Sequence, residues 1–134
     1  MKEWVIDTNV VVSGLLTPSG NAARILDAIV EGRIKLVYDA RILAEYRDVL
    51  RRPKLKIQPF RIDAFLDGLR SQMLVLPKHV DILGPDLDDL IFVEAALATT
   101  TPTIVTGNQS DFPAAICRGI EVLKPAEAAG KLAP

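Results

Sequence analysis

Residues 4–12 read Trp4-Val5-Ile6-Asp7-Thr8-Asn9-Val10-Val11-Val12, a short apolar run that passes directly into three polar residues. Such a run is typical of a buried strand in a parallel sheet. We therefore predict a strand that ends near Asp7 and leaves the polar residues at its terminus. Because a buried strand gains nothing from ending in a charge, Asp7 is the first candidate functional residue.

The rest of the chain alternates between helical and strand patterns. The helices are expected over 22–30, from the N-cap Asp39 to about 50, over 59–72, over 90–98 and after Pro125. Further strands are expected over 34–37, 73–76, 103–106 and 120–123. This alternation indicates an α/β fold, a three-layer α/β/α sandwich with a mainly parallel central sheet, formed by one domain over 1–134.

Composition limits the class of protein. A chain of 134 residues with 49% hydrophobic residues and a net charge of -1 is typical of one soluble globular domain. The single cysteine, Cys117, excludes an internal disulfide framework, and no run of about 18 apolar residues is present to span a membrane. We expect a cytoplasmic protein with no membrane partner.

The charges are distributed unevenly. From Arg24 to Arg70 eleven basic residues face seven acidic ones, whereas His79 to Cys117 contains six acidic residues and no Lys or Arg. This asymmetry suggests a polyanionic partner held next to a cation site.

Acidic residues gather where ligands bind in parallel sheets, at the carboxyl ends of strands. Asp7-Thr8-Asn9 follows the first strand, and residues 106–111 follow the fourth. Two predicted helices add Glu45 and the group Asp86, Asp88 and Asp89. A single acid at a helix start is usually a cap, but three exceed what one cap needs.

If these acids converge, they need a cation. Two carboxylates about 4 Å apart repel by roughly 4 kcal/mol at an effective dielectric constant of about 20. A set of oxygen ligands favours Mg²⁺ or Mn²⁺, and one or two such ions activate a water and stabilise the leaving oxygen of a phosphodiester.

Other catalytic motifs are missing. His79 is the only histidine and no G-x-S-x-G stretch accompanies it, so we expect it to be a surface or hydrogen-bonded residue. Neither a dinucleotide-binding G-x-G-x-x-G nor a P-loop motif occurs.

Four stretches together resemble PIN-domain ribonucleases, especially the VapC-like toxins of toxin-antitoxin pairs. They are residues 5–10 (VIDTNV), 43–53 (LAEYRDVLRRP), 86–96 (DLDDLIFVEAA) and 104–108 (IVTGN). Their order and spacing cover nearly the whole chain. The resemblance implies a metal-dependent endoribonuclease that hydrolyses RNA.

The resemblance also implies roles for individual residues. The acidic ligands of Mg²⁺ or Mn²⁺ carry over as Asp7, Glu45 and Asp89, with Asp86 or Asp88 as helpers. Thr8, Asn9 and Thr106 would orient ligands or water. The family usually has another Asp where this chain has Asn108, so the remaining ligand is either the carbonyl oxygen of Asn108 or the carboxylate of Asp111.

The resemblance further implies partners. The basic residues beside the acids would contact RNA phosphates, and we expect this of Arg47, Arg51, Arg52 and Lys54, with Arg47 and Arg51 on one helical face. A homodimer and a cognate antitoxin protein are implied as well.

Two alternatives stay open. Asn108 would also suit a catalytically weakened PIN-like module that binds RNA or protein without cutting. An unrelated α/β phosphatase or receiver-like domain would likewise place an Asp after its first strand, although no Lys is suitably placed after a later strand.

Overall fold

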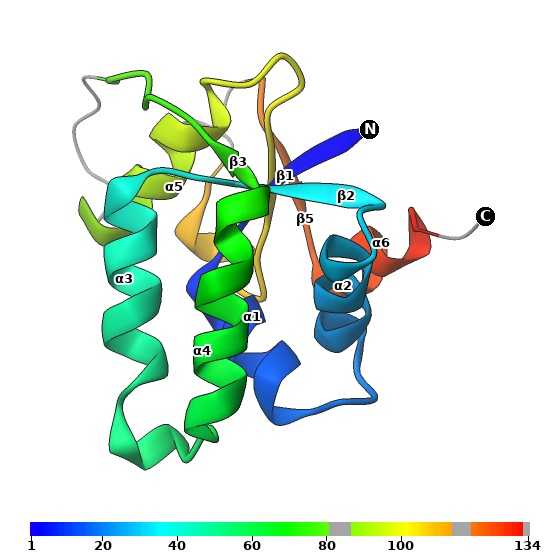
Figure 1. The fold of residues 1–134 in the computed structure, drawn as a ribbon. Coiled ribbons are helices and arrows are strands. Elements are labelled where there is room, and N and C mark those ends of the chain that lie inside the picture. The colour runs from blue at the N-terminus through cyan, green and yellow to red at the C-terminus, as the bar shows by residue number, and fades with distance from the viewer. Residues whose placement is uncertain (81–86, 114–118, 133–134) are drawn as a thin grey trace.

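The computed structural model describes residues 1–80, 87–113 and 119–132. Within these residues, five strands form one all-parallel sheet in the order β3-β2-β1-β4-β5. The strands are β1 (Lys2–Ile6), β2 (Ile34–Tyr38), β3 (Met73–Leu74), β4 (Thr103–Val105) and β5 (Glu121–Leu123). Figure 1 shows the helices that surround this sheet.

The helices connect the strands in two directions. They are α1 (Thr8–Leu16), α2 (Asn21–Val30), α3 (Ala40–Leu50), α4 (Pro59–Gly68), α5 (Leu87–Ala96) and α6 (Pro125–Gly130). The first four lie in the crossovers from β1 to β2 and from β2 to β3, whereas α5 carries the chain back to β4 and packs against β1, β2 and β4. Right-handed crossovers therefore place α5 on the opposite face from α1–α4. Helices α3 and α4 lie side by side in the front of Figure 1.

The chain order reverses between β1 and β4. From β1 the chain runs outward to β2 and β3, and it then returns past β1 to form β4 on the other side of it. Ligands of open parallel sheets bind in the crevice outside the carboxyl ends of the strands at such a reversal. The ends of β1 and β4 are followed by Asp7 and Thr106, so the fold places these two residues where a ligand is expected.

The predicted α/β architecture is confirmed, and the expected strands and helices appear with shifts of a few residues at their ends. The side chain of Asp39 caps α3 as expected, accepting from the backbone N–H groups of Arg41 and Ile42. Helix α1 was not predicted, since three consecutive β-branched valines concealed it. Within the described residues, no helix has the length and apolar character that crossing a bilayer requires.

Close packing of α1 on α2 generates a test of the fold. A Cβ atom at Gly14 would lie 2.5 Å from Leu26 Cδ1 and 3.1 Å from the carbonyl oxygen of Ala22. We expect Gly14→Ala to lower the free energy of unfolding by about 1–3 kcal/mol, because a packed interface must open. Urea denaturation measures this.

Gly68, the last residue of α4, provides the matched control. A Cβ atom there would meet nothing within 4 Å. Gly68→Ala should leave stability unchanged or raise it by up to about 1 kcal/mol. If Gly14→Ala were as stable as the wild type, the described contact between α1 and α2 would be wrong.

Candidate active site

Asp7 is held at the junction of β1 and β4 by both its backbone and its side chain. Ile6 is in register with Val105, so Asp7 and Thr106 are the next neighbours along the two strands. The backbone N–H of Asp7 donates to the carbonyl oxygen of Val105 at 2.9 Å, and the Thr106 hydroxyl donates to Asp7 Oδ2 at 2.7 Å. The Asp7 residue is only 7% exposed.

Helix α3 brings Glu45 to the same place. Its neighbour Tyr46 is fully buried and donates its hydroxyl to the carbonyl oxygen of Ile6 at 2.5 Å, which fixes α3 against the end of β1. The Thr8 hydroxyl, in the first turn of α1, donates to Glu45 Oε2. Glu45 therefore lies beside the segment that carries Asp7, although it is distant in sequence.

The loop after β4 is organised by polar side chains. The backbone N–H of Asn108 donates to the Thr106 hydroxyl at 3.0 Å, and the Asn108 amide donates to Asp111 Oδ2 at 2.9 Å. Ser110 donates to the side-chain carbonyl of Asn108 at 2.6 Å. Asn108 thus presents its amide nitrogen to Asp111 and has its oxygen engaged by Ser110.

Asn9 connects this loop to α1. Its side-chain oxygen accepts from the backbone N–H of Gly107 at 3.2 Å. The residues after β1 and those after β4 are therefore linked directly to each other.

The electrostatics of Asp7 are unfavourable for a charged carboxylate. Burial raises the pKa of Asp7, and the charges of Glu45 and Asp111 raise it further, while the Thr106 hydroxyl and the Thr8 backbone act in the opposite direction. Within the described residues, no Lys, Arg or His forms an ion pair with any of these three acids. Among the residues that the structure describes, negative charge therefore accumulates here without a cationic partner.

A second acidic pair, between the start of α3 and α5, has a cationic partner. Asp39 and Glu94 have side chains only 3% exposed, and Arg41 bridges them at 2.9 Å and 2.7 Å. Burial would raise the pKa of Glu94, but hydrogen bonds from Arg41 and from the Val80 backbone outweigh it and lower that pKa. The fold neutralises these acids with its own cation.

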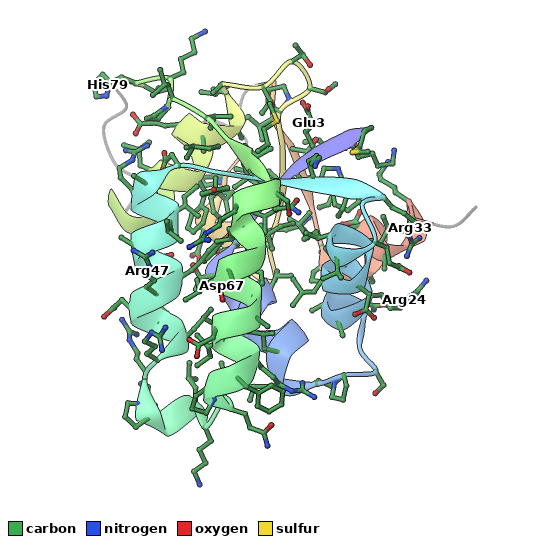
Figure 2. The ribbon with its side chains drawn as sticks, in the orientation of Figure 1. Glu3, Arg24, Arg33, Arg47, Asp67 and His79 are labelled. Carbon is green, nitrogen blue, oxygen red and sulfur yellow. The ribbon has the colours of Figure 1, made fainter. Side chains whose placement is uncertain are left out.

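His79 also contacts Glu94, with its Nδ1 atom 3.1 Å from the carboxylate and its side chain 86% exposed. This agrees with the expected surface or hydrogen-bonded role of the single histidine. Figure 2 shows His79 far from the middle of α3.

A groove leads away from Glu45. It has a volume of about 370 Å³ and is lined by Thr8, Asn9, Val12, Glu45, Val49, Arg52, Lys54 and Leu55. Its lining combines residues of the acidic site with Arg52 and Lys54, which follow the C-terminal end of α3. We refer to the three less exposed apolar residues, Val12, Val49 and Leu55, as its floor.

The four expected phosphate-binding residues divide into two groups. Arg52 and Lys54 line the groove, whereas Arg47 and Arg51 do not. Arg51 forms an ion pair with Asp63 of α4 at 3.0 Å, and Arg47 lies on the exposed side of α3 (Figure 2). Helical periodicity explains why Arg52 lines the groove. Glu45, Val49 and Arg52 follow one another at spacings of four and three residues, which place side chains next to one another.

The structure brings most of the proposed site residues to one edge of the sheet, namely Asp7, Thr8, Asn9, Glu45, Thr106, Asn108 and Asp111. Asp89 lies half-buried in the first turn of α5. Asp86 falls outside the described residues, and so does the side chain of Asp88. Among the described residues, no three acidic, His or Cys side chains gather closely enough to hold a metal alone.

Two features were missed from the sequence. The sequence patterns predicted no role for Tyr46, although a tyrosine in an otherwise apolar helical position indicates a buried hydroxyl that needs a hydrogen-bond partner. The bridge from Arg41 to Glu94 joins residues that are 53 apart in the chain, and no local pattern predicts it.

The donor set suits a hard divalent cation. All the side-chain groups around Asp7 that could bind a metal offer oxygen atoms, and Mg²⁺ is commonly held by one or two carboxylates together with waters and substrate phosphates. A closed three-acid cluster is therefore not required. The uncompensated charge on Asp7 and Glu45 fits such an ion.

A family model described as PIN domain matches residues 3–110 of the chain. The matched region contains β1 through β4, and with them Asp7, Glu45 and Thr106. Neither a curated protein nor a solved structure matches the chain.

The raised pKa of Asp7 predicts a pH-dependent stability in the absence of divalent ions. Because the folded state binds the Asp7 proton more tightly than the unfolded state does, stability is lost as the pH rises above the ordinary value of 3.8 and through the raised pKa. We expect Asp7→Asn to melt at a higher temperature than the wild type at pH 7, with the difference vanishing below pH 3.8.

Thermal unfolding in EDTA across this pH range measures the effect. Asp67→Asn, on an exposed part of α4 (Figure 2), is the control and should show no such trend. A melting-temperature difference for Asp7→Asn that shrank as the pH rose would contradict the assignment.

Proposed function

The chain belongs to the PIN domain family, whose members are in general nucleases, and on that premise we propose that it is a metal-dependent endoribonuclease that hydrolyses RNA phosphodiesters. The observation that carries the proposal is the uncompensated pair Asp7 and Glu45 at the point where the strand order reverses. Between α5 and the start of α3 the fold supplies Arg41 to two acidic side chains, so the absence of such a cation beside Asp7 and Glu45 among the described residues favours an external one.

A bound Mg²⁺ or Mn²⁺ would polarise the phosphate and activate water for its hydrolysis. In the proposal, Asp7 and Glu45 hold the ion. Thr106 and Thr8 orient these carboxylates through their hydroxyl groups, and Asn9 fixes the loop after β4 in place.

The remaining ligands are part of the proposal. Asp89 is proposed to complete the set from α5, with Asp86 or Asp88 as helpers. On the β4 side we favour Asp111 over Asn108, because the charge of Asp111 acts on Asp7 whereas the Asn108 oxygen is engaged by Ser110.

On the resemblance of the sequence motifs alone, we extend the proposal to the toxin of a toxin-antitoxin pair. Such a protein would act in the cytoplasm, form a homodimer and be held inactive by a cognate antitoxin.

A weakened PIN-like module that binds RNA or protein without cutting is the second candidate. The observation that favours it is Asn108, which replaces an acid and brings an amide to the site. The family match makes a phosphatase or receiver-like domain an unnecessary explanation.

Substitution of the two carboxylates tests the proposal. We expect Glu45→Gln and Asp7→Asn each to reduce Mn²⁺-dependent cleavage of single-stranded RNA by about 100-fold or more, because an amide leaves the ion with one anionic ligand fewer. Cleavage rates with a labelled RNA measure this loss, and calorimetric Mn²⁺ titration measures the accompanying loss of affinity.

Asp67→Asn is the control, since Asp67 is exposed on α4 and forms no ion pair within the described residues. It should leave both cleavage and Mn²⁺ affinity close to wild type. Saturable Mn²⁺ binding without cleavage would favour the weakened module, and the absence of both would overturn the nuclease proposal.

A further inference from the structure

The groove beside Glu45 is lined by both acidic-site and basic residues, and its lining suggests what it binds. Arg52 and Lys54 are exposed cations, and Thr8, Asn9 and Glu45 belong to the candidate active site. A polyanion that placed one phosphate at the acidic site would meet these two cations with a neighbouring phosphate.

Both cations are able to engage a ligand. The pair of Arg52 with Asp48 spans one helical turn, and both side chains are more than half exposed, so this pair contributes little stability of its own. Within the described part of the chain, Lys54 forms no ion pair or side-chain hydrogen bond. Replacing the weak Arg52–Asp48 ion pair by a phosphate contact therefore costs little free energy.

The floor of the groove is aliphatic. Val12, Val49 and Leu55 are half-buried and offer an apolar surface, and no aromatic residue of the described part of the chain lines the groove for base stacking. Few polar groups remain to read a base edge, because the Asn9 oxygen accepts from Gly107 and Glu45 accepts from Thr8. Contacts of this kind hold a nucleotide without identifying its base.

We propose that this groove is a nucleotide subsite of the nuclease: it takes one unit of a single RNA strand next to the scissile phosphate, with the phosphate on Arg52 and Lys54 and the base or ribose on Val12, Val49 and Leu55. The inference rests on the proposed function. The ligand is a single strand, because the bases of a duplex are stacked and cannot reach the apolar floor of the groove.

The test measures binding, so it does not depend on cleavage. Anisotropy of a fluorescein-labelled oligouridylate is followed in EDTA at several salt concentrations. Each phosphate contact to a single strand contributes about 0.7 to the slope of log affinity against log salt. Arg52→Ala and Lys54→Ala should each reduce the slope by about 0.7, whereas Val49→Thr should weaken binding at an unchanged slope.

Arg24→Ala is the matched charge control, because Arg24 is exposed on α2, away from α3 (Figure 2). It should leave the slope unchanged, and an oligoadenylate should bind as the oligouridylate does. Equal losses for Arg47→Ala and Arg52→Ala would indicate a diffuse basic face, and preferential duplex binding would exclude the apolar contact; either result overturns the subsite. If the wild type bound no RNA at all, the proposed function would fail together with the subsite.

An independent observation concerns Tyr46. Its buried hydroxyl donates to the carbonyl oxygen of Ile6, the residue before Asp7, and Tyr46 itself follows Glu45 in α3. One side chain therefore joins the backbone segments that carry both carboxylates. Its ring also packs edge-on against Phe65, with centroids 5.6 Å apart, so the ring position does not depend on the hydroxyl alone.

We infer that Tyr46 is a positioning residue that sets the separation of Asp7 and Glu45. Tyr46→Phe keeps the ring and removes the hydrogen bond. The expected result is a Mn²⁺ affinity lower by about 10-fold, together with a changed chemical shift of the Asp7 carboxyl carbon in NMR spectra of the metal-free protein.

Tyr38→Phe is the matched control, because the buried Tyr38 hydroxyl also donates to a backbone carbonyl, that of Leu69, at 2.9 Å. Both variants should lose similar stability in urea, but only Tyr46→Phe should change the Asp7 carboxyl chemical shift and the Mn²⁺ affinity. Equal behaviour of the two variants in both readouts would reduce Tyr46 to a structural role. The NMR readout separates this outcome from a failure of metal binding in the wild type.

Discussion

The parallel pairing of β1 with β4 is the constraint on which the candidate site depends. It sets Ile6 beside Val105, and with them Asp7 beside Thr106, at the one place in the sheet where the chain order reverses. A slip of one residue would turn every following side chain to the other face of the sheet. The register therefore determines both how the two strands pair and where the Thr106 hydroxyl that orients Asp7 lies.

The fold contains two kinds of acidic pair, one with a cationic partner and one without such a partner among the described residues. Asp39 and Glu94 share Arg41, and their contacts hold the start of α3 to α5. Asp7 and Glu45 each receive a hydroxyl group, and Asp7 also the Thr8 backbone, but neither forms an ion pair with a described residue. Such hydrogen bonds orient a carboxylate without cancelling its charge. Hydrogen bonding of this sort preserves the ability to bind a cation, at a cost in stability that the apolar core around β1 offsets.

The sequence was sufficient for the architecture, because strand and helix periodicity and caps such as Asp39 are local signals. It was also sufficient to make Asp7 a candidate site residue, because its charge follows an apolar strand. It did not reveal α1, where Val10, Val11 and Val12 are poor helix formers held in a helix by packing against α2. Nor could it give the contact of Tyr46 with Ile6, or show that Arg52 lines the groove whereas Arg47 and Arg51 do not, because these depend on how distant segments pack.

The direct passage from β1 into α1, with Asp7 as the only residue between them, has a consequence for how such a protein can diversify. There is no loop at this point whose length could vary, so insertions would displace Asp7 and Thr8 together. New specificities must then arise from side-chain exchange along the groove, at positions such as Val12, Val49 and Lys54, while the junction itself stays constant. Substrate range and chemistry are in this way encoded by separate parts of the chain.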